Sequence, residues 1–326
     1  MNAPSPVQPS RTDRADTSGL VTGRGHHIGD KIFAGSAVAA GVLILLTLAG
    51  VTVFLIYEGY PALVADPAEI PGGEGFWHFV APLLFGTVLA AVLALVIAVP
   101  LAVGIALFIS HFAPRRIAAT LGYLVDLLAA VPSVVFGLWG IFFLAPQLVP
   151  AYQWLERNLG FIPLFEGPAS ATGRTMLTAG IVLAVMILPI MTAVNREVFL
   201  QTPVLQEEAS LALGATRWEM IRMTVLPFGR SGIISGAMLG LGRALGETIA
   251  VALVLSPSDQ ITANLIGSVN TSTVAANIAL AFPESSGIAI NALIASGLAL
   301  FILTFLVNVA ARAAIARRRD FSGANA

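Results

Sequence analysis

The stretch QEEASLALGATRWEMIRMTVLP, residues 206–227, concentrates charged side chains between two long apolar runs, at 175–198 and 231–255. Elsewhere the chain avoids charge, since only 11% of its 326 residues are charged, against about 25% in an average soluble domain. We interpret the stretch as a pair of short polar helices held between membrane spans. Such a segment is suited to contact another protein.

The first short helix is predicted over 203–213. Thr202 followed by Pro203 has the pattern of a hydroxyl N-cap with proline at the first helical position. Acidic side chains follow in the N-terminal half, where the helix dipole favours them. Gly214 supplies the stop at the C-terminal end.

A second short helix is predicted from Arg217 to about Leu226. Thr216 and Glu219 have the spacing of a capping box, in which each side chain accepts a hydrogen bond from a free backbone N–H of the other's turn. Pro227 makes continuation costly. On spacing alone, an ordinary re-entry loop with incidental caps remains the alternative.

Composition places the chain among polytopic membrane proteins. Hydrophobic residues make up 57% of it, and the mean hydropathy is +0.87. A bilayer crossing takes about 20 apolar residues, and runs of that length or more occur at 32–57, 79–110, 117–149, 175–198, 231–255 and 286–315. We therefore predict an all-α bundle with six transmembrane spans, of which the second and third are tilted, kinked or longer than the bilayer because they are long and contain proline.

The basic residues predict the orientation. With the N-terminus inside, 14 of the 17 Lys and Arg residues fall on the cytoplasmic side, as the positive-inside rule requires. Arg157 and Arg174 fall outside, and Arg243 falls within a span. Both termini and the 199–230 loop are therefore predicted to be cytoplasmic.

The two ends of the chain read as tails. Residues 1–31 have the composition of a disordered cytoplasmic tail, and the apolar run at 32–57 is too long for a secretory signal, so it is predicted to remain as the first transmembrane helix. Residues 317–326 form a basic cytoplasmic tail. His26 and His27 have no nearby third ligand and are interpreted as solvated rather than metal-binding.

Several functions are excluded or disfavoured by what the sequence lacks. There is no cysteine, which excludes disulfides, and the near-zero net charge gives no sign of nucleic-acid binding. The single lysine, Lys31, does not follow the glycine pattern of a P-loop. The spans hold no nucleophile, base and metal arrangement, so an enzyme is not expected. If the chain belongs to a pump, a partner must supply the energy.

Glycine spacing in the fifth apolar run predicts close helix packing. Gly232, Gly236 and Gly240 recur every four residues, and Gly242 and Gly246 repeat that interval on a neighbouring face. Small residues at this spacing let other helices approach closely in a membrane. We expect this helix to be surrounded by protein on most sides.

Arg243 and Glu247 lie in the middle of the same run, at i and i+4, where they can form an ion pair along one helix face. A charge at the bilayer centre costs at least ~2.5–3.5 kcal/mol, so the pair is expected to face water or the bundle interior. One interpretation is a buried ion pair that holds helices together. The other is that the guanidinium of Arg243 binds an oxyanion in transit while Glu247 positions it. The residues alone leave both open.

Three weaker candidates lie in the third apolar run. Asp126 either pairs with a neighbouring helix or faces a vestibule, and we favour the structural role. Pro132 and Ser133 interrupt the run, so freed backbone groups there are candidates for lining a pathway.

The polar stretch also carries a resemblance. The residues EAS at 208–210, Gly214 and LP at 226–227 have the spacing of the EAA loop of ABC importer permeases, E-A-A, three residues, G, nine residues, I-x-L-P. The chain departs from it with Ser210 for the second alanine and Thr224 for the isoleucine. In that family the loop is cytoplasmic and docks in a groove on the ATPase subunit. The resemblance therefore implies a role in ATPase coupling for Glu207, Glu208, Ala209, Gly214, Ala215, Thr216 and Arg217.

A closer resemblance covers most of residues 79–256. The segments AVPLAVGIALFIS (98–110), VPSVVFGLWG (131–140), ALGATRWEMIRMTVLPFGRSGI (212–233) and GLGRALGETIAVALVL (240–255) are similar to phosphate-specific ABC importer permeases of the PstC type. The resemblance implies a type I importer permease (MetI-like) domain over 79–316 in a bacterial plasma membrane. Arg243 and Glu247 match charged residues implicated in that family's translocation path.

The resemblance also implies partners. They are a PstA-type sibling permease, a PstB-type ATPase dimer that binds ATP and Mg²⁺, so that this chain needs no cofactor, and a PstS-type phosphate-binding protein. Two alternatives remain. A sulfate or molybdate permease would share the EAA loop and the need for oxyanion contacts. An ion-coupled secondary transporter or channel would need no ATPase, but neither inverted repeats nor a carboxylate cluster is evident.

Overall fold

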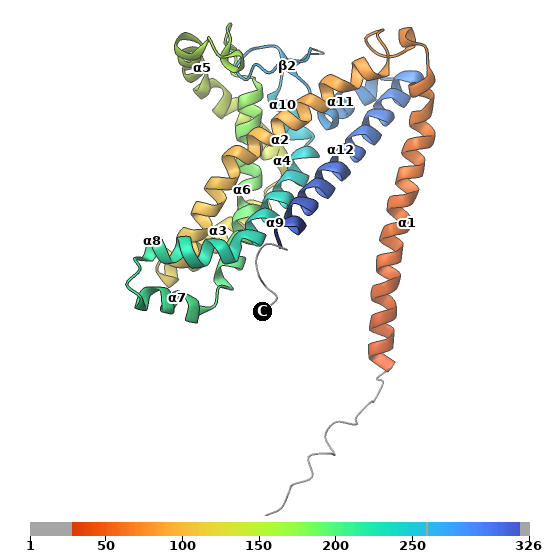
Figure 1. Cartoon of the computed structure of the whole chain (residues 1–326). Helices are drawn as coiled ribbons and strands as arrows, with labels where there is room; N and C mark the ends of the chain where they lie inside the picture. The colour runs from red at the N-terminus through yellow and green to blue at the C-terminus, as the bar shows by residue number, and fades with distance from the viewer. Residues whose placement is uncertain (1–27, 259, 320–326) are drawn as a thin grey trace, which may run out of the picture. The chain divides into compact units, whose positions relative to one another are not determined.

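The computed structural model describes residues 28–258 and 260–319, which are helical almost throughout (Figure 1). The chain divides into two compact units, Met1–Val53 and Phe54–Ala326. The described part of the first unit is a stretch of helix α1 (Ile28–Val64). The elements discussed below belong to the second unit.

Five helical segments in the described part of the chain are long and apolar enough to cross a membrane: Lys31–Val64, Phe76–Phe112, Ser133–Leu159, Met176–Leu200 and Ile288–Ala313. In Figure 1 they carry the labels α1, α2 (Phe76–Leu107), α4 (Ser133–Trp139) with α5 (Ala145–Leu159), α6 (Met176–Leu200) and α12 (Ile288–Arg319). The predicted all-α membrane fold is confirmed. The count of six spans is not, because the structure divides the fifth apolar run.

The remaining elements are shorter. They are α3 (Arg115–Ala129), α7 (Val204–Ala212), α8 (Arg217–Met220), α9 (Leu226–Leu245), α10 (Ile249–Val254), α11 (Val274–Ala281), β1 (Pro257–Ser258) and its parallel partner β2 (Asn270–Thr271). Single 3₁₀ turns lie at Pro67–Glu69, Pro163–Phe165 and Phe282–Glu284, and π-helical turns at Phe108–Phe112, Gly140–Leu144 and Ile221–Val225.

The fifth apolar run was expected to be one helix over 231–255, and that expectation is wrong. Helix α9 ends at Leu245 with Gly246 at its C-cap, and the chain resumes as α10. Glycine loses more conformational freedom in a helix than other residues, so a break there is cheap. The carboxylate of Glu247 then accepts a hydrogen bond from the backbone N–H of Ala250 (3.2 Å), which satisfies one of the free donors that open α10.

The predicted third span at 117–149 is also wrong. Helix α3 ends at Ala129, and a new helix begins at Ser133 and runs through a π-helical turn to Leu159. Pro132 causes the break, because proline lacks an N–H and disfavours helical geometry at the residue before it. Apolar residues on both sides of the break made the two helices look like one run.

The chain ends differ slightly from the predicted tails. Helix α1 begins at Ile28, so the last residues of the predicted tail 1–31 are helical, and α12 extends to Arg319, into the predicted tail 317–326. The rest of both predicted tails lies outside the described residues.

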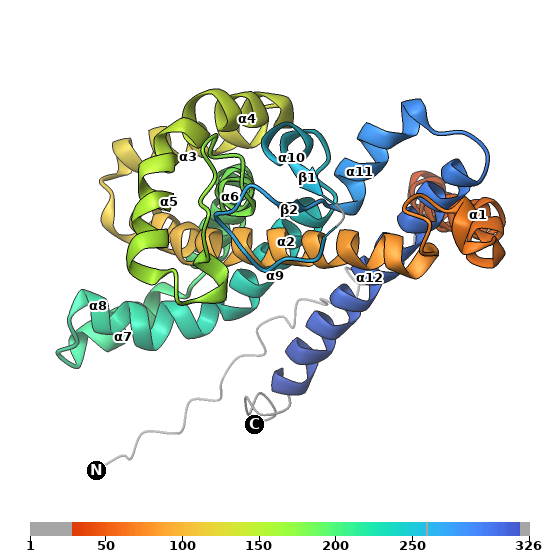
Figure 2. The ribbon, with the colours of Figure 1, turned by 90° about the horizontal axis from the view of Figure 1, so that it is seen from above.

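Helix α6 forms the centre of the second unit. Viewed from above, it is surrounded by α2, α3, α4 and α10 (Figure 2), and it also packs along α9. In the most apolar 18-residue segment of α6, 61% is buried, the largest share among the five spans. Thr192 and Asn195, fully buried on this helix, carry side-chain atoms without a hydrogen-bond partner among the described residues.

The contact between α6 and α9 depends on the glycines predicted to allow it. A Cβ atom on Gly232 would overlap the side chain of Val198, and one on Gly240 would lie 2.8 Å from the Met191 sulfur. Gly236 is buried between them. The prediction of close approach along this face is therefore confirmed.

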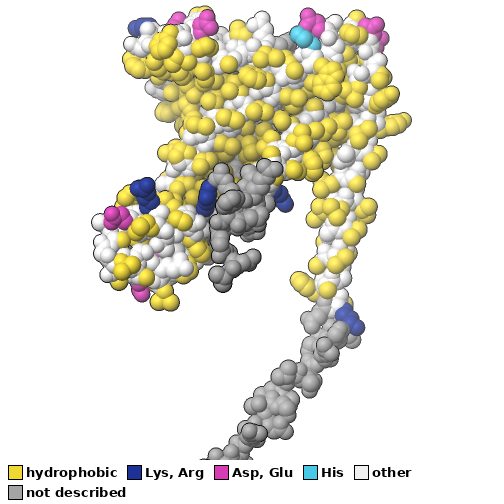
Figure 3. Space-filling view, in the orientation of Figure 1, with side chains coloured by type: hydrophobic (Ala, Val, Ile, Leu, Met, Phe, Trp, Pro, Cys, Tyr) yellow, Lys and Arg dark blue, Asp and Glu magenta, His cyan; other side chains and the backbone are white. Residues whose placement is uncertain are grey.

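Hydrophobic and charged side chains occupy different parts of the surface along the helices. Hydrophobic side chains cover the flank of the second unit, whereas charged side chains gather at the ends of its helices (Figure 3). The α7–α8 segment lies at one end, and α5, β2 and the turn between α11 and α12 lie toward the other (Figure 1). Together with the spans, this distribution is that of a multi-pass membrane protein.

Replacing Gly232 by leucine is expected to destabilise the second unit. The new side chain would enter space held by Val198, and overpacking of a core typically costs about 1–3 kcal/mol. Thermal unfolding of the purified protein measures the effect. Gly104→Leu is the matched control, because a Cβ at Gly104 meets nothing within 4 Å. Equal unfolding midpoints for the two variants would contradict the packing described here.

Candidate functional site

The segment between α6 and α9 largely has the predicted form. Helix α7 covers Val204–Ala212, within a residue of the prediction at each end. Gly214 ends the helix with a φ of 89°, a left-handed conformation that favours glycine. The capping box is present: the Thr216 hydroxyl accepts from the Glu219 N–H (3.3 Å), and the Glu219 carboxylate accepts from the Thr216 N–H (2.8 Å).

Two local predictions in this segment are wrong. Thr202 does not cap α7, because Pro203 occupies the N-cap position and the Thr202 hydroxyl is buried without a partner among the described residues. The second helix does not end before Pro227. The π-helical turn at Ile221–Val225 bonds the Leu226 N–H to the Ile221 carbonyl, and this wider turn lets the chain continue through the proline into α9.

The two departures from the EAA consensus contact each other. The hydroxyl of Ser210 on α7 lies 2.9 Å from the hydroxyl of Thr224 in the π-helical turn. Alanine and isoleucine at these positions would have no such bond. The pair therefore joins α7 to the turn that leads into α9.

Most of the predicted coupling residues are accessible. Glu208, Ala209, Gly214, Thr216 and Arg217 are exposed, and Ala215 is half-buried. Large apolar side chains are exposed around them: Leu205 (80%), Leu213 (89%), Trp218 (58%) and Met223 (60%). An apolar patch of this kind on a polar segment typically marks a protein interface.

Glu207 differs from the other predicted coupling residues. It is half-buried and lies 3.4 Å from the Nε2 atom of His111, which follows α2. The structure thus directs Glu207 toward the bundle, away from the exposed face of α7.

The expected ion pair between Arg243 and Glu247 is not formed. Within the described part of the chain, the ion pairs closer than 4.0 Å are His78 with Glu74 and His111 with Glu207. Because the helix ends between Arg243 and Glu247, the two no longer lie on one helical face. Glu247 bonds to the backbone of α10 instead, and both side chains are half-buried.

Arg243 is thereby left beside an open face of α9. Gly242 and Gly246 are exposed, and a Cβ at Gly242 would meet nothing within 4 Å. The predicted close approach at this second glycine pair is absent among the described residues. Several buried polar side-chain atoms in the described residues lack a hydrogen-bond partner, but none of them belongs to Arg243.

Helix α4, which begins at Ser133, packs against α10, which begins just after the break at Gly246. A Cβ at Gly137 would lie 2.9 Å from the Cα of Ala250, and a Cβ at Gly140 would lie 3.0 Å from the side chain of Val254. Residue numbers rise together along the contact, so the two segments run in the same direction. Pro132 is exposed and Ser133 is half-buried.

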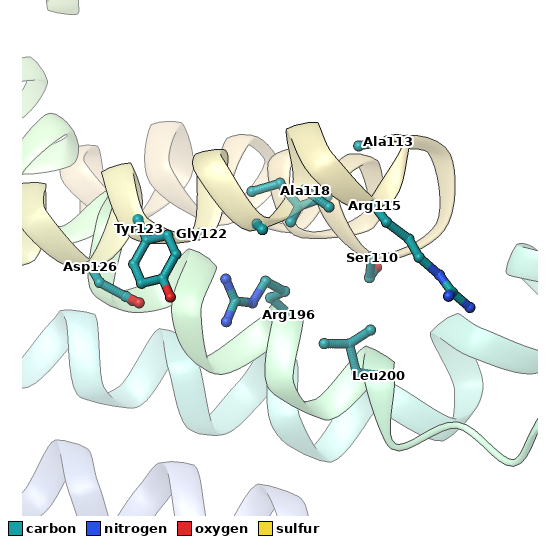
Figure 4. Close-up of a pocket in the computed structure, with 11 residues that line it drawn as sticks. Ser110, Ala113, Arg115, Ala118, Gly122, Tyr123, Asp126, Arg196 and Leu200 are labelled. Atoms are coloured by element: carbon teal, nitrogen blue, oxygen red, sulfur yellow. The ribbon is translucent and has the colours of Figure 1, made fainter.

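Asp126 lies apart from these groups, on α3. It lines a cavity of about 530 Å³ between α3 and α6, together with Arg196 and Tyr123. Figure 4 shows the guanidinium of Arg196 directed toward Gly122 and Tyr123, with Asp126 beyond them. Arg243 does not line this cavity.

One arginine that caps α10 was not predicted from the sequence. Arg174 was counted only as a basic residue on the outside. Its guanidinium donates to the carbonyls of Leu255 (2.7 Å) and Leu253 (3.4 Å) and so satisfies the end of α10. Its partners lie about 80 residues away in sequence, so no local pattern indicates them.

Comparison with known proteins gives a family match over most of the chain. Residues 98–320 match the family described as "Binding-protein-dependent transport system inner membrane component". The chain is 50% identical over 297 residues to the "Phosphate transport system permease protein PstC 2" of Mycobacterium tuberculosis, covering 87% of this chain and 91% of that protein. It is 47% identical over 295 residues to the PstC protein of Mycobacterium leprae, covering 87% and 92%.

Solved structures support the fold. A bacterial ABC transporter involved in import of the acidic polysaccharide alginate aligns with a TM-score of 0.57 at 16% identity, covering 87% of this chain and 96% of that chain. The same type of transporter in complex with a pentasaccharide-bound periplasmic protein aligns with a TM-score of 0.53, covering 87% and 95%. At this identity the likeness concerns the fold alone.

The Ser210–Thr224 contact is expected to show coupling in a double-mutant cycle. Ser210→Ala and Thr224→Val each remove one hydroxyl, and the double variant should lose less stability than the sum of the two. A hydrogen bond of this kind contributes about 0.5–1.5 kcal/mol, and thermal unfolding of the three variants measures the coupling. Strict additivity would show that the hydroxyls do not interact.

The capping box is expected to weaken in acid. Hydrogen bonds from the backbone and side chain of Thr216 lower the pKa of Glu219. A lowered folded-state pKa means that the contribution is present above the ordinary carboxyl pKa and is lost as the pH falls through the folded value. Amide hydrogen exchange at Thr216 should show this loss of protection. Glu219→Gln is the control, because glutamine can still accept the bond but has no titration in this range; the same pH profile in both proteins would refute the assignment.

Proposed function

We propose a function for this chain from one premise: it belongs to the family of binding-protein-dependent transport system inner membrane components, which matches residues 98–320. The chain is the permease subunit of an ATP-driven phosphate importer. Together with a homologous permease it forms the translocation pathway. Its role is transport, and no chemistry on phosphate is assigned to it.

The observation that carries the proposal is the position of Arg243. This guanidinium stays protonated at neutral pH and offers a fork of donors that fits an oxyanion. It lies beside the open face at Gly242 and Gly246, and it has no acidic partner within 4.0 Å in the described part of the chain. A cation left without a partner inside a membrane bundle is expensive, and a passing anion would relieve that cost.

The two helix breaks support the location of the pathway. Interrupted helices recur at the substrate sites of membrane transporters, because their freed backbone groups can face a cavity. Here α4 begins after the break at Pro132 and packs against α10, which begins after the break that follows Arg243. We place Pro132 and Ser133 at the pathway on this basis. Glu247 acts there by fixing the start of α10 rather than by pairing with the arginine.

The exposed face of the α7–α8 segment supports docking on an ATPase. Glu208, Leu205 and Leu213 are exposed on it, as a docking helix requires. In the proposal, a PstB-type ATPase dimer binds ATP and Mg²⁺, a PstA-type permease pairs with this chain, and a PstS-type protein delivers phosphate. Both termini and the segment lie on the cytoplasmic side of a bacterial plasma membrane. The basic residues of that segment, Arg217 and Arg222, agree with this orientation.

The movement follows from these parts. Closure of the ATPases on ATP carries α7 and α8 with them. The π-helical turn at Ile221–Val225 is continuous with α9, so the motion passes directly to the helix that carries Arg243. A bundle of closely packed helices tilts as a body, and this exposes the arginine alternately to the two sides.

Another oxyanion is the second candidate, since Arg243 would also bind sulfate or molybdate. The names of the relatives favour phosphate. Competition separates the candidates: excess sulfate or molybdate should leave phosphate uptake unchanged. Strong inhibition by either anion would move the proposal to that substrate.

Arg243→Gln is expected to abolish most phosphate uptake while the complex assembles and hydrolyses ATP. A hydrogen bond to a charged group contributes about 1.5–3 kcal/mol, so uptake should fall by roughly 10- to 100-fold. Radiolabelled phosphate uptake by the assembled transporter in vesicles measures this. Arg157→Gln is the matched control, because Arg157 is exposed near the end of α5 and should be neutral. Normal uptake by the Arg243 variant would refute the role assigned to this arginine.

A further inference from the structure

Helix α7 has few attachments to the rest of the protein. None of its residues is buried. In the part of the chain that the structure describes, two side-chain hydrogen bonds connect it to other elements: Ser210 with Thr224, and Glu207 with His111. Besides its flanking backbone and its packing against α8 and the Ile221–Val225 turn, these two hydrogen bonds are the routes by which a force on α7 can reach the bundle.

The two contacts lead to different helices of the bundle. Thr224 lies in the π-helical turn that continues into α9. His111 lies in the π-helical turn Phe108–Phe112 that ends α2. Helix α2 packs along both α6 and α9, so a displacement of His111 acts on the centre of the bundle without passing through α8 and α9.

The ring of His111 is held on both sides. Its Nδ1 atom lies 2.7 Å from the hydroxyl of Ser110, which also lies 2.8 Å from the Ala106 carbonyl. Its Nε2 atom lies 3.4 Å from a carboxylate oxygen of Glu207. A carboxylate only accepts hydrogen bonds, so Nε2 must carry the hydrogen of this contact. The ring is thereby oriented toward α7 before any partner binds.

The contact between His111 and Glu207 is largely shielded from solvent, which strengthens its electrostatic attraction. The His111 side chain is 10% exposed and that of Glu207 is 21% exposed, so water screens the pair less than it screens an ion pair on the surface. The separation of 3.4 Å exceeds the usual 2.9–3.0 Å of such bonds. The contact is therefore loose in this conformation, and a small approach of α7 would tighten it.

We propose that His111 is a positioning residue for energy coupling, which transmits the movement of α7 to α2 through Glu207. This inference rests on the proposed function, because it assumes that an ATPase moves α7. It adds a coupling residue outside the 199–230 loop, and it gives Glu207 a role different from that of its exposed neighbour Glu208. Glu208 faces the partner, and Glu207 passes the motion inward.

The test measures the coupling ratio, which is the phosphate imported per ATP hydrolysed by the assembled transporter in vesicles. His111→Ala should leave assembly and ATP hydrolysis in place and lower the ratio at least about fivefold. His78→Ala is the matched control. His78 also contacts a carboxylate, that of Glu74 (2.5 Å), but it is exposed and lies at the opposite end of α2. Its ratio should equal that of the wild type.

A charge exchange separates a specific contact from a merely structural one. His111→Glu and Glu207→His should each lower the coupling ratio, and the two changes together should restore much of it. His111→Gln should keep a ratio near the wild type, because its amide can still donate to Glu207. If His111→Ala does not assemble, Glu207→Ala serves in its place, because it removes the same contact and should lower the ratio. An unchanged ratio in His111→Ala, or an exchanged pair no better than either single variant, would overturn the inference.

Failure of the proposed function would look different. A wild-type complex that hydrolyses ATP but imports no oxyanion would count against the importer itself. A wild-type complex that imports phosphate, beside a His111→Ala complex with the same ratio, would count only against His111. Import of sulfate or molybdate instead of phosphate would change the substrate but leave the comparison of coupling ratios valid.

Discussion

Each interruption of a membrane helix must leave its peptide groups bonded, because the bilayer core offers no water to replace them. In this structure polar side chains and a widened turn meet that requirement. Glu247 accepts from the first turn of α10, and Arg174 donates to its last carbonyls. In the π-helical turn before Pro227, the Leu226 N–H donates to the carbonyl of Ile221, five residues earlier. Of these partners, Glu247 is the one at the break next to Arg243.

That constraint also explains why Arg243 is available. In a continuous helix, Glu247 would lie one turn from it and neutralise it. The break moves the carboxylate to the backbone of α10 and leaves the guanidinium beside exposed glycines. The same bond therefore stabilises the interrupted helix and frees the cation that we assign to the pathway.

Features with local causes were predictable from the sequence. The capping box at Thr216, the left-handed Gly214 and the close packing at Gly232 follow from spacing alone, and the structure contains all three. The helix breaks were not predictable in the same way. A continuous run of apolar residues does not reveal that two helices meet at Pro132. It also does not reveal that a helix ends at Gly246.

Other features depend on contacts between distant parts of the chain. Nothing in the sequence near Arg174 indicates that it caps α10, and nothing near His111 indicates that it meets Glu207, 96 residues later. Thr202 shows the converse, since its local pattern predicted a cap that tertiary packing overrode by burying the hydroxyl. The expected ion pair failed for a related reason, because it assumed a helix that does not continue.

The hydroxyl pair of Ser210 and Thr224 has a consequence for protein engineering. A chimaera that received α7 from a relative with alanine at the first position would leave Thr224 without its partner, and one that received only the following turn would leave Ser210 bonded to the Gln206 carbonyl alone. The residues at positions 210 and 224 should therefore be transferred together. Loop transplants between such importers should therefore place their junctions outside both residues.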